Sequence, residues 1–139
     1  MTLVGFYVVQ AAEPQARLSV AARLADKAFQ RGHRIFINAA DEAQASELDA
    51  LLWRFRPASF IPHGLHGQEN SESVAIGWGQ EPDNHNDLLI NLQLGIPSFF
   101  SRFQRVAEVV TQDPSSLAAL RESWKFYKER GYQLEKHDL

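Results

Sequence analysis

The sequence predicts a three-layer α/β domain built around a mostly parallel central sheet. Short, nearly continuous apolar runs alternate along the chain with amphipathic segments at helical spacing, which is the order typical of this fold class. The first strand, helix and strand follow one another within about 36 residues, the size of a βαβ unit. The length of 139 residues suits one domain. We therefore expect a single domain over residues 1–139.

The first third of the chain carries the strongest of these signals. Residues 3–9 (Leu-Val-Gly-Phe-Tyr-Val-Val) form an apolar run that predicts a buried strand. Apolar residues then recur at helical spacing over residues 15–31, and Gly32 gives a stop signal. A second buried strand is predicted over residues 34–38. A strand–helix–strand unit implies that these two strands run parallel.

The middle of the chain begins with a helix. Asp41 followed by Gln44 resembles a capping box, and the helix it opens is expected to run through Trp53. Residues 59–62 are expected to form a short edge segment, because Pro62 cannot donate to a strand ladder. The polar, glycine-containing residues 63–73 predict a loop.

Two short strands are predicted next, over residues 74–78 and 88–92. Residues 96–110 are expected to be helical, because four apolar side chains share one helical face there: Phe99, Phe103, Val106 and Val110.

The C-terminal part opens with Asp113 and Pro114, an N-cap and first-turn pair. They predict a helix that runs to about Arg130 and stops at Gly131. A final strand over residues 132–134, followed by a frayed tail, completes the expected order.

Composition excludes several kinds of protein. The chain has no cysteine, which rules out disulfides and thiolate metal sites and fits a reducing cytoplasm. No signal peptide or membrane-length apolar run is present. Lys and Arg total 14 against 17 Asp and Glu, a formal net charge of -3. Proteins that bind DNA directly normally carry a basic field, so we expect weak or no direct DNA binding. From the lack of a membrane-length apolar run and of cysteine we expect no membrane partner and a cytoplasmic location.

No catalytic motif stands out. Neither a dinucleotide-binding fingerprint nor a Walker loop occurs, and Ser98 does not lie in a nucleophile elbow. The alternative function is a small nucleotide- or metal-dependent α/β enzyme that uses the His63 and His66 loop, with His85 and Asp87 as further ligands. The favoured interpretation is that these are polar loop residues. We therefore expect a non-catalytic protein without a cofactor or metal.

The last predicted helix has the clearest two-sided pattern in the chain. Leu117, Leu120, Trp124 and Tyr127 occupy one sector, and a purely basic stripe lies beside it, made of Arg121, Lys125 and Lys128. One interpretation is a solvated basic face next to a buried tryptophan. The other is a docking groove for an acidic peptide, in which arginine clamps a carboxylate and the tryptophan gives an apolar wall.

A second candidate surface lies around residues 53–62. Four large apolar side chains gather there at a helix end and a proline-bounded segment: Trp53, Phe55, Phe60 and Ile61. They either face the core or form an apolar patch at a partner interface, with Arg54 and Arg56 as its basic rim.

Over nearly its whole length the chain resembles the chi subunit of bacterial DNA polymerase III. The resemblance runs through Phe6-Tyr7, Gly32-His33-Arg34-Ile35, Asp41-Glu42-Ala43-Gln44-Ala45, Leu51-Leu52-Trp53, Arg56-Pro57-Ala58-Ser59-Phe60-Ile61-Pro62-His63, Asp87-Leu88-Leu89-Ile90-Asn91-Leu92 and Arg121-Glu122-Ser123-Trp124-Lys125-Phe126-Tyr127. Its most specific part is the tryptophan followed by the Phe-x-Pro-His segment.

The resemblance implies a Rossmann-like fold without nucleotide chemistry and a role as an accessory subunit of the clamp-loader assembly. It implies two partners, the psi subunit and the acidic C-terminal tail of single-stranded DNA-binding protein, with the clamp loader reached indirectly. The tail site would comprise Val110, Arg121, Trp124, Lys125 and Lys128. The psi interface would comprise Trp53, Phe60, Ile61 and Pro62. Trp124 stands where the family usually has tyrosine, so the site would keep its wall and lose a hydroxyl.

Overall fold

The computed structural model describes residues 2–54, 63–65 and 73–139. The helices and strands along the chain are β1 (Leu3–Val8), α1 (Pro14–Gln30), β2 (Ile35–Asn38), α2 (Glu42–Arg54), β3 (His63–Leu65), β4 (Val74–Gly77), β5 (Leu88–Asn91), the 3-10 helix η1 (Phe100–Arg102), β6 (Arg105–Val110), α3 (Pro114–Glu129) and β7 (Gln133–Asp138).

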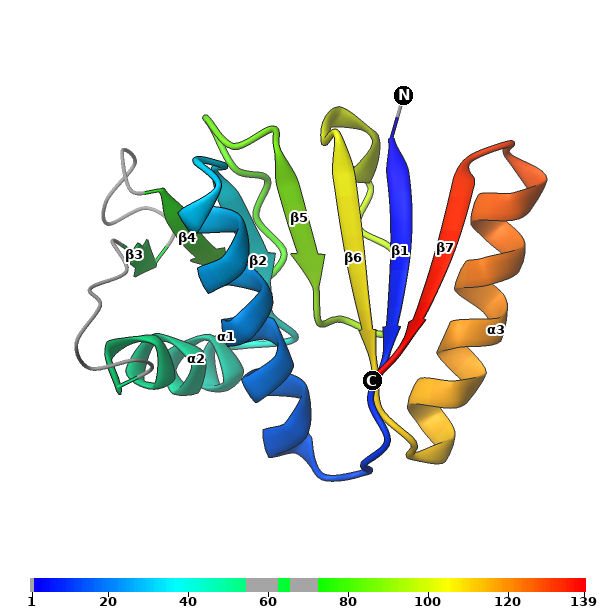
Figure 1. Cartoon of the computed structure of the whole chain (residues 1–139), viewed down its shortest axis with the longest axis horizontal. Helices are drawn as coiled ribbons and strands as arrows, with labels where there is room; N and C mark the ends of the chain where they lie inside the picture. The colour runs from blue at the N-terminus through cyan, green and yellow to red at the C-terminus, as the bar shows by residue number, and fades with distance from the viewer. Residues whose placement is uncertain (1, 55–62, 66–72) are drawn as a thin grey trace.

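The strands form one seven-stranded sheet in the order β3-β4-β2-β5-β6-β1-β7. Each of its six strand pairings is parallel, which confirms the predicted parallel sheet. β1 and β2 run parallel as expected, but β5 and β6 lie between them. In Figure 1, α1 and α2 lie toward the β3 end of the sheet, and α3 lies beside β7 at the other end.

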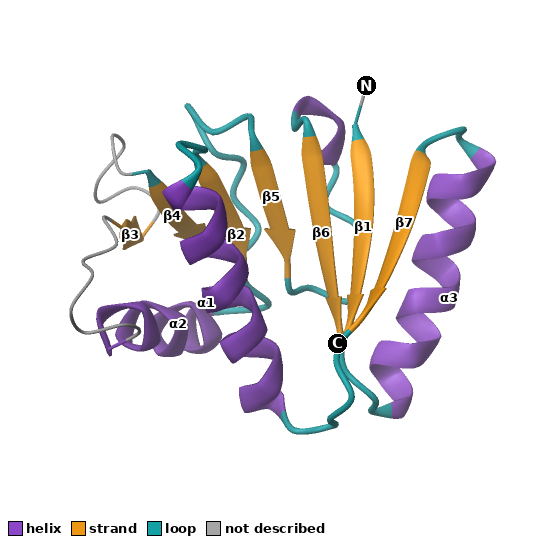
Figure 2. Cartoon of the chain, viewed as in Figure 1, coloured by secondary structure: helices purple, strands orange, loops and turns teal. Residues whose placement is uncertain are grey.

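Apolar side chains cover both faces of the sheet, and strand alternation divides them into two cores. Ile35 and Ile37 on β2 point to the core under α1 and α2. Phe36, between them, points to the core that holds Tyr127 of α3 and three phenylalanines from residues 99–103. Helices therefore lie on both sides of the sheet, as Figure 2 also shows, and the predicted three-layer α/β fold is confirmed.

The expected helix over residues 96–110 is wrong. The chain forms the short helix η1 there and then strand β6, which lies between β5 and β1. Val106 and Val110 are four residues apart, and this spacing puts two side chains on one face of a strand as well as on one face of a helix. Because β6 is buried on both sides, its sequence shows no strand alternation that would have distinguished the two.

Two other boundaries differ from the expectation. Strand β7 extends to Asp138, in place of a strand over residues 132–134 with a frayed tail. Residues 63–65, expected to be part of a loop, form β3 at the edge of the sheet. The edge segment predicted over residues 59–62 lies outside the described residues.

The predicted N-terminal caps of α2 and α3 are confirmed by the hydrogen bonds that they form. The Gln44 amide donates to Asp41 Oδ1 at 2.8 Å, and Gln44 Oε1 accepts from the Ala40 amide at 2.7 Å, which satisfies two groups before α2. Asp113 caps α3 by accepting from the Ser116 amide at 3.1 Å. Gly32 and Gly131 follow α1 and α3 with φ of 83° and 80°, a conformation that glycine adopts without steric cost.

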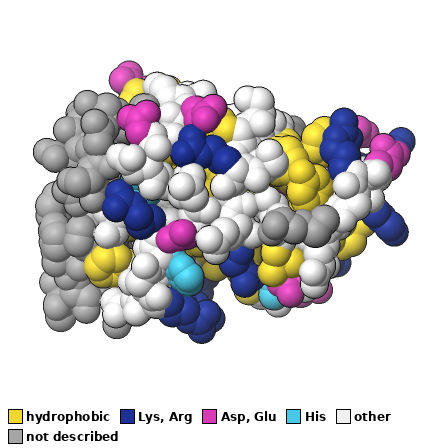
Figure 3. All heavy atoms as spheres, turned by 90° about the horizontal axis from the view of Figure 1, so that it is seen from above, with side chains coloured by type: hydrophobic (Ala, Val, Ile, Leu, Met, Phe, Trp, Pro, Cys, Tyr) yellow, Lys and Arg dark blue, Asp and Glu magenta, His cyan; other side chains and the backbone are white. Residues whose placement is uncertain are grey.

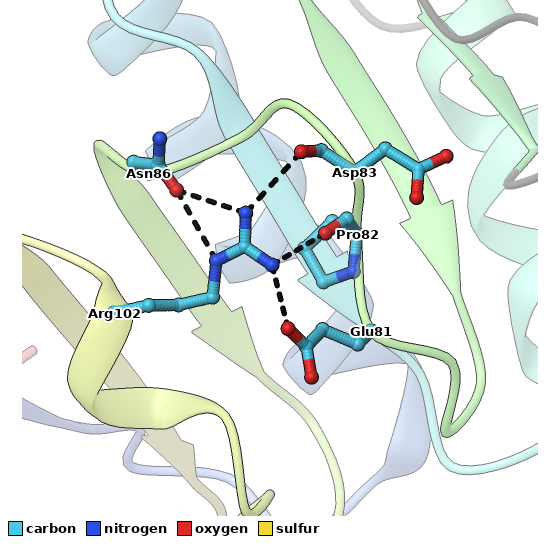
Figure 4. A network of polar contacts seen from close by, with 5 residues as sticks. All are labelled: Glu81, Pro82, Asp83, Asn86 and Arg102. Carbon is cyan, nitrogen blue, oxygen red and sulfur yellow. Dashed lines mark hydrogen bonds and ion pairs between the residues drawn. The ribbon is translucent and has the colours of Figure 1, made fainter.

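Arg102 ties η1 to the loop between β4 and β5 (Figure 4). Its guanidinium donates to Glu81 Oε2 at 2.8 Å and to the carbonyl of Pro82 at 2.6 Å. On its other side it donates to Asn86 Oδ1 at 3.0 and 3.2 Å. These contacts join two segments that have little regular structure of their own.

Among the described residues, no helix is both long and apolar enough to span a bilayer.

Candidate peptide-binding site on α3

Helix α3 packs on the core that contains Phe36, and only a narrow side of the helix is buried there. Ser116, Ser123 and Tyr127 are its buried residues, and Leu117, Leu120 and Trp124 pack against the core while partly exposed. Asp113 fixes the start of the helix, since its carboxylate also accepts from the hydroxyl groups of Thr111 and Ser116. These hydrogen bonds, that of Thr111 first among them, lower the pKa of Asp113 to about 2.

The predicted basic stripe is on the surface. Arg121, Lys125 and Lys128 are all exposed, whereas Trp124, beside them, is only partly exposed. The Trp124 ring packs on Phe6 of β1 with centroids 5.1 Å apart and planes tilted by 49°. Three cations thus border an aromatic side chain that the sheet holds in place, which is an arrangement that can receive a short acidic peptide.

Val110 has a different environment from the other predicted tail-site residues. It lies at the end of β6, not at the end of a helix as expected, and only 5% of it is exposed. It belongs to the same apolar cluster as Trp124. The space that remains near it, between β6 and the start of α3, is about 10 Å³. That volume holds about one water molecule, so Val110 supports the helix from below and offers little surface to a ligand.

The opposite side of α3 borders a wider groove of about 450 Å³, lined by Leu94, Ile96, Phe100, Glu122 and Phe126. Its charged group is the carboxylate of Glu122, which would repel an acidic peptide. The Arg130 guanidinium lies 3.7 Å from the centroid of the Phe126 ring and brings one cation to this side. The stripe of Arg121, Lys125 and Lys128 has three cations and is the side better suited to an anionic ligand.

A buried polar row beneath α3 was not predicted from the sequence. Asn38, Asn91 and Glu108 occupy matching positions on β2, β5 and β6. The Asn38 amide donates to Asn91 Oδ1 at 3.1 Å, and the Asn91 amide donates to Glu108 Oε1 at 3.0 Å. Tyr127 completes the row from α3 by donating its hydroxyl to Glu108 Oε2 at 2.8 Å. The signal available in the sequence was an asparagine at or next to the end of two predicted strands, Asn38 in residues 34–38 and Asn91 in residues 88–92.

Burial raises the pKa of Glu108 to about 7, and the hydrogen bonds from Tyr127 and Asn91 hold it below what burial alone would give. Arg17 of α1 acts in the same direction through its charge, while its guanidinium donates to the Val109 carbonyl at 3.0 and 3.1 Å. Burial and the nearby carboxylate together raise the pKa of Tyr127. The titratable carboxyl group of Glu108 therefore lies in the core beneath α3 and is bonded to that helix through Tyr127.

The second predicted surface is described only in part. Trp53 lies in the last turn of α2, and its side chain is outside what the structure describes. Phe60, Ile61 and Pro62 also lie outside the described residues, as does Phe55. The assignment of these residues to a psi interface stays a prediction.

The histidine loop of the alternative hypothesis is likewise only partly described. His63 begins β3, His66 lies outside the described residues, and His85 is buried at 2% exposure. Asp87 accepts from the Arg34 amide at 2.8 Å. Among the described residues, no three His, Cys, Asp or Glu side chains gather in a way that could hold a metal ion.

Comparison with known proteins gives the chain its family. Residues 1–135 match the family model described as DNA polymerase III chi subunit, HolC. The chain belongs to the DNA polymerase III chi subunit family. A protein of Pseudomonas aeruginosa named DNA polymerase III subunit chi is 50% identical over 139 residues, covering 100% of this chain and 98% of that protein.

More distant chi relatives agree. The protein of the same name from Haemophilus influenzae is 32% identical over 123 residues, covering 86% of this chain and 85% of its own. That of Escherichia coli is 32% identical over 114 residues, covering 80% and 78%. Family membership confirms the predicted resemblance and places the chain in a DNA replication assembly. It fits the expectation of an accessory, non-catalytic subunit.

Proposed function

We propose that this chi-family chain connects two proteins of the replication assembly. Helix α3 binds the acidic C-terminal tail of single-stranded DNA-binding protein, and the surface that begins at the end of α2 binds the psi subunit. The observation that carries the proposal is the exposed stripe of Arg121, Lys125 and Lys128 beside the partly exposed Trp124, in a chain whose net charge is -3. The psi surface would comprise Trp53, Phe60, Ile61 and Pro62.

At the tail site, each type of side chain has a distinct role. Arg121 presents a planar fork that can hold a carboxylate through two parallel hydrogen bonds, while Lys125 and Lys128 add point charge. Trp124 offers its exposed edge to an apolar side chain of the tail, and Phe6 keeps the ring from turning away. Val110 would take part as the buried support beneath the helix.

A short peptide on an exposed site should bind weakly, with a dissociation constant on the order of 1 μM or above. Several tails displayed by one protein would raise the effective concentration and strengthen the contact. Because the cations are exposed, added salt should weaken binding. Contacts of this kind form and release readily, which suits a connection that is remade during replication.

The fold supports a connection between separate partners. α2 contacts β3 and β4 at one edge of the sheet, and α3 packs near β7 at the other. Seven strands with neighbours about 4.8 Å apart give a sheet about 29 Å wide. A partner on α2 and a partner on α3 would therefore bind near opposite edges of the sheet.

The decisive experiment is a titration of Arg121→Ala with a fluorescently labelled acidic tail peptide. We expect affinity to fall about tenfold, the loss of one charge-assisted contact. Arg23→Ala is the matched control, because Arg23 is exposed on α1 and lies away from α3. Affinity within about twofold of the unchanged chain for Arg121→Ala, or an equal loss in both variants, would contradict the tail-site assignment.

For the second surface, Phe60→Ala should abolish co-purification with psi and leave tail binding unchanged. Retained co-purification would show that Phe60 is not part of the psi contact. Unfolding of the variant, followed by circular dichroism, would place Phe60 in the core.

A further inference from the structure

A cavity of about 170 Å³ lies on the α1 side of the sheet, away from α3. It lies between the C-terminal half of α1 and the amino ends of β5 and β6. Four small or aliphatic side chains give it an apolar floor: Leu24, Ala28, Leu88 and Ala107. Neither surface of the proposed function includes these residues.

An aromatic wall closes one side of this cavity. Tyr7 of β1 lines it, and the Tyr7 ring stacks on His137 of β7 with centroids 4.6 Å apart and planes 14° from parallel. The stacking restrains the phenol ring, so the wall is in place before any ligand arrives. A planar or apolar body of modest size could therefore lie on the floor against Tyr7.

Cations surround the opening. Lys27 lies in the last turn of α1, Arg31 caps the C-terminal end of that helix, and Arg105 is the first residue of β6. His33 also lines the cavity. Seen from the end where β1, β5 and β6 begin, a histidine lies among cationic side chains along one side of the molecule, with an acidic side chain beside it (Figure 3).

Acidic groups nearby offset only part of this positive charge. Asp87 lines the cavity and its carboxylate accepts from the Arg34 amide at 2.8 Å, so one acidic group stands against the three cations. Glu135 is 3.7 Å from Arg105, at the long limit for an ion pair. Within the part of the chain that the structure describes, no carboxylate pairs with Lys27 or Arg31.

We propose that this cavity binds a phosphate group attached to a ring-bearing body, as in one nucleotide unit. Lys27, Arg31 and Arg105 hold the phosphate from two elements, and the sugar or base lies on the apolar floor beside Tyr7. A phosphate has oxygens on several sides and suits cations that approach from different directions, whereas one arginine fork satisfies a carboxylate. The source is either a free nucleotide or a unit of single-stranded DNA.

Helix electrostatics do not explain this set of cations. Lys27 and Arg31 would stabilise the C-terminal end of α1 in any protein, but Arg105 lies on a strand and faces the same cavity. The partial negative charge at that helix end opposes an anion, so affinity should be low. Weak binding agrees with the acidic overall charge of the chain.

The test is a titration of the isotopically labelled full chain, followed by amide chemical shifts at constant ionic strength. The probes are thymidine 5′-monophosphate, thymidine, a short oligodeoxythymidine and an acidic peptide. We expect the monophosphate to shift amides at Lys27, Arg31, Leu88 and Arg105. Arg31→Gln should weaken this binding at least about fivefold, and Arg23→Gln, which removes the same charge from the same helix, should change it less than about twofold.

The probes separate the two sources. Oligodeoxythymidine that binds at least about tenfold more tightly than the monophosphate at these amides identifies a DNA strand, and equal affinity identifies a free nucleotide. Thymidine binding as well as its monophosphate, tighter binding of the acidic peptide, or equal losses in Arg31→Gln and Arg23→Gln would each overturn the proposal. If Arg31→Gln disturbs the end of α1, Arg105→Gln serves as the second variant, because it removes a cation from the opposite wall of the cavity and should also weaken binding of the monophosphate.

Discussion

The hydroxyl of Tyr127 on α3 donates a 2.8 Å hydrogen bond to Glu108 Oε2 on β6, and both side chains are buried. Around this bond the Tyr127 ring makes edge contacts with Phe6 and Phe100, with centroids 6.0 and 5.3 Å apart. A directional bond inside an apolar contact fixes the rotation of the helix about its axis. The orientation of the stripe of Arg121, Lys125 and Lys128 therefore depends on a pair of buried residues that lie outside the proposed tail site.

Tyr127→Phe should destabilise the chain more at pH 8 than at pH 5.5. At pH 8 Glu108 is largely ionised, and the variant leaves it without its bond from Tyr127. The expected loss in the free energy of unfolding is about 2 kcal/mol there, the usual size for a hydrogen bond to a charged group. Urea unfolding at both pH values measures it. Tyr132→Phe serves as the control, and an equal loss at the two pH values would show that Glu108 is not the partner that matters.

Glu108→Gln should abolish a pH dependence of stability. Burial raises the pKa of Glu108 to about 7 in the folded chain, from an ordinary value of 4.5. The folded state thus binds the proton more tightly, so the contribution is fully present below about pH 4.5 and is lost as pH rises through 7. The loss can reach about 3 kcal/mol, at 1.36 kcal/mol for each pKa unit.

Urea unfolding across pH 5 to 8, relative to the wild-type chain, gives the comparison. The glutamine variant should gain relative stability as pH rises, because its side chain cannot ionise and still accepts from Tyr127. A constant difference between the two chains over this range would mean that Glu108 titrates outside it.

Asp113→Ala should weaken the start of α3. The variant loses the bond to the Ser116 amide and the contacts with two hydroxyl groups, at a cost of about 1 kcal/mol for a helix cap. Asp113→Asn, which keeps an acceptor, should cost less. Because the pKa of Asp113 is lowered to about 2, its contribution is present above pH 3.8 and lost as pH falls through 2. Thermal unfolding of both variants at pH 7 tests the order of their effects.

Arg102→Lys should loosen the loop between β4 and β5. A lysine keeps the charge but cannot reach Glu81, the Pro82 carbonyl and Asn86 at once, as the guanidinium does. We expect amide hydrogen exchange of residues 80–87 to accelerate at least about tenfold, with much smaller changes in α1. Uniform acceleration over the whole chain would indicate a global loss of stability instead.

Sequence patterns predicted the parts of the fold whose signals are local. The helices α1 and α3 have proline at the first turn and glycine after the end, and the apolar runs of β1, β2, β4 and β5 are bounded by polar residues. The basic side of α3 was also predicted, because helical periodicity alone decides which residues share a face. Its exposure follows from the burial of the opposite side.

What the patterns did not predict depends on distant contacts. β6 was expected to be helical because the spacing of Phe99, Phe103, Val106 and Val110 fits one helical face. The partners that make the buried Glu108 carboxylate tolerable in a strand come from β5 and α3. β7 was expected to be short because its sequence, Gln-Leu-Glu-Lys-His-Asp, is largely polar. A strand at the sheet edge with one side in solvent can carry such residues, and charges there discourage pairing with another chain.

The position of β1 bears on how the chain is made. Residues 3–8 pair with β6 and β7, the last two strands in the sequence, and β1 lies between them in the sheet. During synthesis, β2 and β4 can meet while β1 still has no neighbour along either edge. Of the seven strands, β1 is therefore the first to be synthesised and among the last to be paired. Its apolar residues must wait for nearly the whole chain, which makes the final closure of the sheet slow and sensitive to loss of the C-terminus.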